Sequence, residues 1–357
     1  MKIKKITLEN VRCFKNFDLN LTTDKSEETL SHCVLVGRNG TGKSTILQFV
    51  VKLFTWLISW YEKVPDDIVD NLFVDEDIYF GEKYLRIAVF LEFNHEEQEI
   101  IGQSELAIGY QHFAKEIGES DSFFTPKYFH SNEEFESYQL CLNKFTKVIL
   151  MGRLLYFDAF RFLSRENPIG PNLQEKIPTG YSLLQANFDN YGRNTERDFE
   201  LKQWIINVDY MRLKNISGRY EILYHHLVKA FDLLLHPLKF ENINEEGKII
   251  FKDEKNDQFI PIDMLSDGFK SVFQIILGTM RMLFDGFPGV DLFYRNAGIV
   301  LVDEIDCHIH PRWQKSLMPS LSELFPNCQF IVTSHSPYII ESVQDYEIKR
   351  VGDKSIE

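Results

Sequence analysis

A glycine-rich run ending in lysine and serine constrains this chain more than any other stretch. It fits the pattern G-x-x-x-x-G-K-[ST], the Walker A motif, at every fixed position. In order, the run and the residue after it are Gly37, Arg38, Asn39, Gly40, Thr41, Gly42, Lys43, Ser44 and Thr45. An apolar stretch typical of a buried strand precedes the run at 33–36, and one typical of a helix follows it at 46–54. A chance match in an ordinary turn is disfavoured because strand, loop and helix come in the required order.

The residue types of this run predict a phosphate-binding loop. Glycines let the backbone wrap closely around an anion, and the amides at a helix start point toward it. Lys43 is expected to reach the β- and γ-phosphates of ATP, and the Ser44 hydroxyl is expected to ligate Mg²⁺. The sequence therefore predicts ATP and Mg²⁺ as ligands, with the whole run as the nucleotide cradle.

A second apolar strand, at 298–302, ends in Asp303 and Glu304. This is the Walker B arrangement, in which Asp303 holds Mg²⁺ close to Ser44 and Glu304 orients or deprotonates the attacking water. A buried strand that merely ends in two solvated acids is common. That alternative loses weight because a Walker A run lies upstream.

Two shorter signals complete the set. A strand-like stretch at 328–332 is followed by His335, which would lie beside the γ-phosphate if the strands are parallel neighbours, although a lone histidine is more often structural. Ser266, Asp267 and Gly268 open an apolar helix and offer another anion-binding helix end. The same three residues could also form an ordinary N-cap.

Composition limits the class of protein. The 357 residues are 44% hydrophobic and carry a formal net charge of -14, which suits a large folded core and argues against coating of nucleic acid by the whole surface. The five scattered cysteines predict neither a disulfide framework nor a zinc site, and a reducing interior is expected. No signal peptide and no bilayer-length apolar helix is seen, so a soluble, cytoplasmic protein without a membrane partner is expected.

The order of elements predicts an α/β fold. Residues 1–93 form the first part of an ATPase head, 94–260 a helical or mixed insertion lobe, and 261–357 the second part of the head. A hairpin is expected near 240–251, with its turn at 244–247. No heptad run is long enough for a coiled-coil arm.

The motif order resembles the heads of ABC-type P-loop ATPases. More specifically, the chain resembles the SMC, RecF and OLD-like branch and the bacterial anti-phage defence ATPases of the Septu type. The resemblance rests on the stretches 9–16, 265–268, 303–311 and 333–337. It implies an ABC-type head fold and a homodimer in which two heads enclose ATP, with a higher oligomer also allowed.

The resemblance also implies roles for single residues. Ser266 and Gly268 of one protomer would close on the γ-phosphate held by Lys43 of the other, with Asp267 between them. Asp306 would lie in the loop that crosses the dimer interface, and Arg12 would contact nucleotide. Asp267 stands where transporters of this superfamily have glycine, which counts against a membrane partnership. The family's polar-loop glutamine has three candidates that the sequence does not separate, namely Gln98, Gln103 and Gln185.

Two function classes remain. In the first, the chain is the ATP-hydrolysing switch of an anti-phage system and controls a separate effector such as a nuclease. In the second, it is a RecF-like repair ATPase that binds DNA directly. The missing arms, the acidic balance and the short stretch after His335, which leaves no room for a nuclease domain, favour the first. Weak DNA binding by the chain alone is expected, and 144–147 with Arg153 and 202–219 are the candidate basic surfaces. A binding module without turnover is disfavoured by Glu304.

Overall fold

A parallel five-stranded sheet forms the middle layer of the molecule in this computed structural model. Its order is β13 (Ile348–Arg350), β3 (His32–Val36), β12 (Gln329–Thr333), β11 (Ile299–Val302) and β7 (Leu154–Phe157). The structure describes residues 1–23, 27–62, 72–119, 121–124, 131–148, 153–159, 170–172, 195–287 and 289–352. The inner strands are almost wholly apolar because both faces of the sheet are covered.

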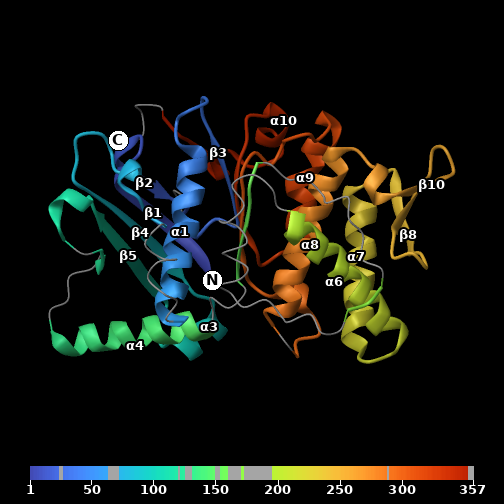
Figure 1. Cartoon of the computed structure of the whole chain (residues 1–357), viewed down its shortest axis with the longest axis horizontal. Coiled ribbons are helices and arrows are strands. Elements are labelled where there is room, and N and C mark those ends of the chain that lie inside the picture. Colours follow the sequence, from blue (N-terminus) through green and yellow to red (C-terminus); the bar gives the residue numbers. More distant parts are fainter. Residues whose placement is uncertain are drawn as a thin grey trace.

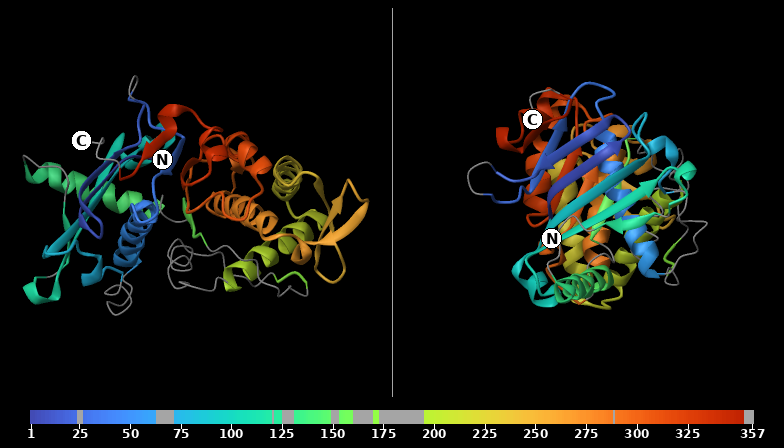
Figure 2. Two further views of the ribbon diagram at one scale, coloured as in Figure 1. Left: turned by 90° about the horizontal axis from the view of Figure 1, so that it is seen from above. Right: turned by 90° about the vertical axis from the view of Figure 1, so that its left-hand side faces the viewer.

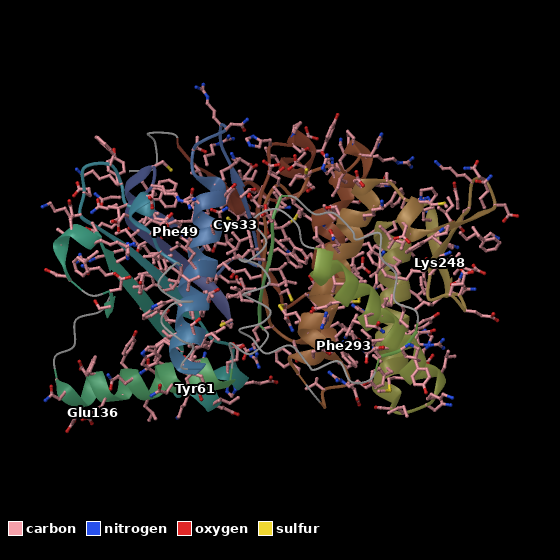
Figure 3. All side chains as sticks on the ribbon, viewed as in Figure 1. Cys33, Phe49, Tyr61, Glu136, Lys248 and Phe293 are labelled. Carbon is pink, nitrogen blue, oxygen red and sulfur yellow. The ribbon has the colours of Figure 1, made fainter. Side chains whose placement is uncertain are left out.

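Alternate residues of the central strands enter two different cores. Leu35, Leu301 and Ile331 belong to one hydrophobic cluster, whereas Val302 and Val332, each one residue away from a member of the first set, belong to the other. This follows from the period of two along a strand. Phe49 lies in the first core and Phe293 in the second, and they mark the two sides in Figure 3.

The first lobe covers one face of the central sheet with helix α1 (Lys43–Glu62) and an antiparallel sheet. That sheet runs β2 (Phe14–Asn20), β1 (Lys2–Val11), β4 (Tyr84–Glu92), β5 (Glu105–Phe113) and β6 (Ser122–Phe124). Helices α3 (His95–Ile101) and α4 (Asn132–Val148) lie at its end, and Phe145 of α4 packs on Phe54 of α1 with ring centroids 6.4 Å apart. Figure 2 shows this sheet facing the viewer in its right-hand view.

The second lobe covers the opposite face with helices (Figure 1). They are α6 (Thr195–Leu213), α7 (Gly218–Leu234), α8 (Asp267–Asp285), α9 (Pro311–Leu324) and the short α10 (Pro337–Ile340). A small antiparallel sheet, β8 (Leu238–Ile243), β9 (Ile249–Asp253) and β10 (Gln258–Pro261), ends this lobe. Short 3₁₀ turns lie at Asp75–Asp77 (η1), Lys115–Ile117 (η2), Ile262–Met264 (η3), Phe293–Arg295 (η4) and Asp345–Glu347 (η5).

Several expectations from the sequence can be compared directly with the structure. The hairpin with a turn at 244–247 is present as β8 and β9. The stretch 94–260, expected as one insertion lobe, is instead distributed over three places: β5 and β6 extend the first-lobe sheet, β7 joins the central sheet, and α6 to β10 build the second lobe. Across the described residues, no helix is both long and apolar enough to cross a membrane.

Candidate functional site

The carboxyl ends of four central strands bring the sequence motifs to one edge of the sheet. β3 leads into the Walker A run, β12 into His335, β11 into Asp303 and Glu304, and β7 into Asp158. Because all four strands are parallel and in register, with Val302 beside both Val332 and Phe157, these segments emerge side by side. Such an edge is the usual ligand site of an open α/β sheet.

The Walker A run forms a tight loop between β3 and α1. Gly42 has φ +95°, and a Cβ there would lie 2.4 Å from the Phe14 ring and 2.6 Å from Cys13 Sγ, so only glycine fits. Arg38, Asn39 and Gly40 are exposed at the tip, and Gly37, Thr41 and Ser44 are half-buried. Thr45 is buried in the first turn of α1.

Lys43 begins α1 and its side chain folds back along the loop. Its Nζ donates to the carbonyl oxygens of Gly37 and Arg38, both at 3.0 Å. Burial lowers the pKa of Lys43, while the nearby carboxylates, Asp303 first and Glu304 next, act in the opposite direction. The lysine therefore lies within the electrostatic reach of the Walker B acids, as the two motifs together predict.

Thr333, the last residue of β12, holds both Walker B residues. Its Oγ1 donates to Asp303 Oδ1 at 2.5 Å and accepts from the backbone N–H of Glu304 at 2.7 Å. Asp303 is buried, whereas Glu304 is exposed and has φ +45°, a left-handed conformation uncommon for glutamate. No role for Thr333 was predicted from the sequence; the available signal was that Thr333 opens the stretch 333–337, which ends the strand before His335.

The loop after Walker B is fixed by hydrogen bonds from the segment around His335. Ser334 Oγ donates to Asp306 Oδ1 at 2.5 Å, and Ser336 Oγ donates to Gln314 Oε1. Gln314 Nε2 in turn donates to the Ile309 carbonyl at 2.7 Å. These bonds hold Asp306 while His335 itself stays exposed, so the histidine is presented at the sheet edge.

The segment with Ser266, Asp267 and Gly268 lies at the start of α8. A Cβ on Gly268 would stand 2.3 Å from the carbonyl oxygen of His308, so glycine is required where α8 meets the loop after Walker B. Ser266 is the N-cap residue by backbone geometry, but its side chain makes no capping hydrogen bond. Ser266 and Asp267 are exposed. Ser266 therefore begins the helix without a side-chain cap, and its contact with a second copy's nucleotide stays a prediction.

Arg12 lies in the turn between β1 and β2 and binds within its own lobe. Its Nε donates to Asp77 Oδ1 at 2.9 Å and its Nη1 to Gln48 Oε1 at 3.0 Å. Asp77 is buried and also pairs with Lys52 of α1. Arg12 thus ties the turn to α1, and its contact with nucleotide stays a prediction.

The described residues include two of the three glutamine candidates for the polar loop. Gln98 lies in α3, where its Nε2 donates to the Phe93 carbonyl at 2.7 Å, and Gln103 precedes β5 in the same lobe. Gln185 lies outside the described residues. Asp158 follows β7, the strand beside Walker B. The identity of the polar-loop glutamine therefore stays a prediction with three candidates.

The residues at this edge suit a nucleoside triphosphate with a divalent cation. The loop packs closely against Cys13 and Phe14 at Gly42, and it contains the buried Lys43. Ser44 and Asp303 offer the hydroxyl and carboxylate oxygens that Mg²⁺ prefers. Ser44 and Asp303 would hold the cation, and Lys43 with the loop amides would hold the phosphates.

Several cations of the basic stretches named as possible DNA surfaces are engaged within the protein, whereas Lys144 and Lys214 are exposed. Arg153 pairs with Glu97 at 2.7 Å, Lys202 with Asp263 at 2.6 Å and Arg212 with Asp209 at 2.8 Å. Arg219 donates to main-chain carbonyls, among them Phe287 at 2.8 Å. Paired or buried cations neutralise few phosphates, so these four cations are expected to contribute little to duplex binding.

Comparisons with known proteins also indicate an ATPase domain. A model described as "AAA domain, putative AbiEii toxin, Type IV TA system" matches residues 33–341. The chain is 24% identical to a "Retron Ec83 probable ATPase" of Escherichia coli, over 98% of this chain and 71% of the relative. It is 23% identical to "Septu protein PtuA" of Bacillus mycoides, over 97% of this chain and 40% of the relative. A "Retron Vc95 probable ATPase" of Vibrio cholerae is 28% identical over 50% of this chain and 31% of the relative. The chain thus spans less than half the length of two of these relatives.

Solved structures support the fold. The head of an SMC protein bound to the C-winged helix domain of ScpA aligns with a TM-score of 0.54 and 16% identity, over 96% of this chain and 92% of that one. An SMC head with an extended coiled coil, bound to the C-terminal domain of ScpA from Pyrococcus furiosus, gives 0.51 and 14%, over 96% and 92%. The predicted P-loop head fold is confirmed.

Proposed function

The chain belongs to the AbiEii-type AAA-domain family, and from that premise we propose that it is an ATP-hydrolysing switch in anti-phage defence. Two copies pair head to tail on ATP, and the pair controls a separate effector, for which a nuclease is the leading class. The family match supports nucleotide binding, and the retron and Septu relatives support the defence setting. Pairing and effector control are the parts that experiment must establish.

Two observations support this proposal, one for each half of the ATP site that two copies would share. In one half of the site, Lys43 lies close enough to Asp303 and Glu304 for their charges to act on its pKa. In the other half, Ser266 is exposed at the start of α8, and its hydroxyl does not cap its own helix. A helix N-terminus favours an anion, so the second half suits the γ-phosphate held by a second copy.

Each residue then has a defined task. Lys43 and the loop amides bind the triphosphate, and bound Mg²⁺ would neutralise charge that develops on it. Thr333 fixes one oxygen of the Asp303 carboxylate, which leaves the second oxygen for the Mg²⁺ that Ser44 and Asp303 would share. Glu304 accepts a proton from the attacking water, and its exposed position suits that role. His335 donates a hydrogen bond toward the γ-phosphate.

The first test separates binding from turnover. Glu304→Gln keeps the shape of the site but removes the base, so ATP binding persists, turnover falls by about 100-fold or more, and an ATP-bound dimer accumulates. Lys43→Ala instead loses binding. Gel filtration with and without ATP, together with phosphate release, measures both. A monomer that turns over ATP at the normal rate after Glu304→Gln would overturn the assignment.

The second test asks whether the site is shared. Ser266→Arg should bind ATP but not pair, and Lys43→Ala should not bind. A mixture of the two variants contains dimers with one complete site, formed by Lys43 of the first variant and Ser266 of the second. ATP-dependent pairing should therefore return in the mixture. Two folded variants that stay monomeric when mixed with ATP would exclude the head-to-tail arrangement.

A further inference from the structure

A buried lysine of the second lobe holds the segment that leads into Ser266. Lys202 of α6 is 1% exposed, and its Nζ donates to Asp263 Oδ1 at 2.6 Å. Asp263 lies in η3, three residues before Ser266. A lysine is almost never fully buried unless it is paired, so this contact is a specific feature of the fold.

Asp263 lies in a short segment in which buried and exposed side chains are interspersed. Its neighbours Ile262 and Leu265 are buried in the second core, whereas Met264 between them is 78% exposed. The N–H of Leu265 donates to the Ile262 carbonyl at 3.1 Å, which closes the turn. The Ser266 carbonyl then accepts from the N–H of Lys270 at 3.1 Å as α8 begins. The position of Ser266 therefore depends on how this turn is held, and Lys202 holds its polar side.

Helix α6 also contacts the opposite end of α8. Trp204 packs edge-on against Phe284, with ring centroids 6.2 Å apart. Arg281 of α8 lies 3.4 Å from Glu200 of α6. Helix α6 thus contacts both the turn before α8 and the last turns of α8.

We propose that Lys202 is a positioning residue for ATP-driven pairing: through Asp263 it sets the orientation of Ser266 and couples α6 to the shared ATP site. This inference rests on the proposed function, because it acts on the half-site that a second copy would contact. Breaking the pair takes the Lys202 ammonium away from the partly exposed Asp263 carboxylate, and a carboxylate that loses this charge favours a position closer to water. The turn then moves with it, and Ser266 leaves the position that pairing requires.

The test compares Lys202→Met with Lys229→Met. Lys229 pairs with Glu323 at 2.8 Å, but both side chains are more than half exposed, so its loss has little effect. Lys202→Met should bind ATP within about twofold of the unmodified chain, because Walker A lies in the other lobe. Its ATP-dependent dimerisation should weaken by about tenfold or more, as a 1.4 kcal/mol change would produce. Lys229→Met should pair normally.

Mixing experiments distinguish a positioning role from a general loss of structure. Lys202→Met mixed with Lys43→Ala contains one complete site, so pairing should return. Lys202→Met mixed with Ser266→Arg contains none, because both variants are defective on the same half, so pairing should be no stronger than that of Lys202→Met alone. Rescue by both partners, or by neither, would overturn the inference.

The two proposals fail separately in this design. If the unmodified chain and Glu304→Gln do not pair on ATP, the proposed function fails. If they pair and Lys202→Met pairs equally well, only the Lys202 inference fails. Should Lys202→Met not fold, Asp263→Asn enters the same assays, since Asp263 is partly exposed and the amide keeps its shape. Normal pairing by folded Asp263→Asn would equally exclude the role.

Discussion

Replacing Thr333 with valine tests the arrangement of the Walker B residues most directly. Valine keeps the shape of the side chain but removes the hydroxyl, which makes one bond to the Asp303 carboxylate and one to the Glu304 amide. A hydrogen bond to a charged group contributes about 1.5–3 kcal/mol, and a buried group left unpaired costs about 1–3 kcal/mol. Since the two bonds share one atom and are not additive, we expect the free energy of unfolding to fall by about 2–4 kcal/mol.

The same change should weaken metal use. Asp303 is buried and accepts a hydrogen bond from Thr333, so without the hydroxyl its carboxylate is less firmly oriented for the proposed Mg²⁺ site. Loss of such a supporting partner typically costs about 10–100-fold in metal affinity or activity. Two measurements check this: urea unfolding without nucleotide, and the Mg²⁺ concentration that gives half-maximal ATP binding and turnover.

Two control variants narrow the interpretation. Thr333→Ser keeps the hydroxyl and should retain most of the Mg²⁺ response. Thr279→Val makes the same chemical change in α8, where Thr279 Oγ1 is buried and has no hydrogen-bond partner among the described residues. That variant should be neutral or slightly stabilising. If Thr333→Val matches Thr279→Val in both unfolding and Mg²⁺ titration, the proposed role of the Thr333 hydroxyl is wrong.

Three further predictions follow from single contacts. Gly268→Ala places a Cβ 2.3 Å from the His308 carbonyl oxygen, so stability should fall by about 1–3 kcal/mol and ATP-dependent pairing should weaken, as denaturation and gel filtration would reveal. Burial lowers the pKa of His226 to about 4, so the folded state resists a proton that the unfolded chain accepts below about pH 6.5. The unfolding free energy should therefore decline by on the order of 2 kcal/mol between about pH 7 and pH 5, and His226→Gln, unlike the exposed His225→Gln, should remove that decline. Duplex DNA should bind the chain at micromolar strength or weaker and dissociate near physiological salt, and tight, ATP-stimulated binding that survives that salt would favour the RecF-like alternative.

Much of the central site could be predicted because it is built from local patterns. The Walker A loop needs a strand, a glycine turn and a helix start within about twenty residues, and backbone sterics alone favour that conformation. Walker B and the strand before His335 are short apolar runs that end in polar residues, as buried parallel strands do. The parallel register then brings these ends together, so Lys43, Asp303 and His335 reach one edge of the sheet.

Other features depend on which distant segments pack together, and no local pattern encodes that choice. The short run at 154–157 is apolar in any arrangement, but only pairing with β11 places Asp158 beside Walker B. Lys202 looks like part of a basic helix face until tertiary packing buries it against Asp263, 61 residues away. Thr333 is an ordinary strand residue until β11 lies beside β12. Local sterics and periodicity can thus be predicted from the sequence. Ion pairs and supporting hydrogen bonds between residues far apart in the sequence form only when the two hydrophobic cores pack on the central sheet.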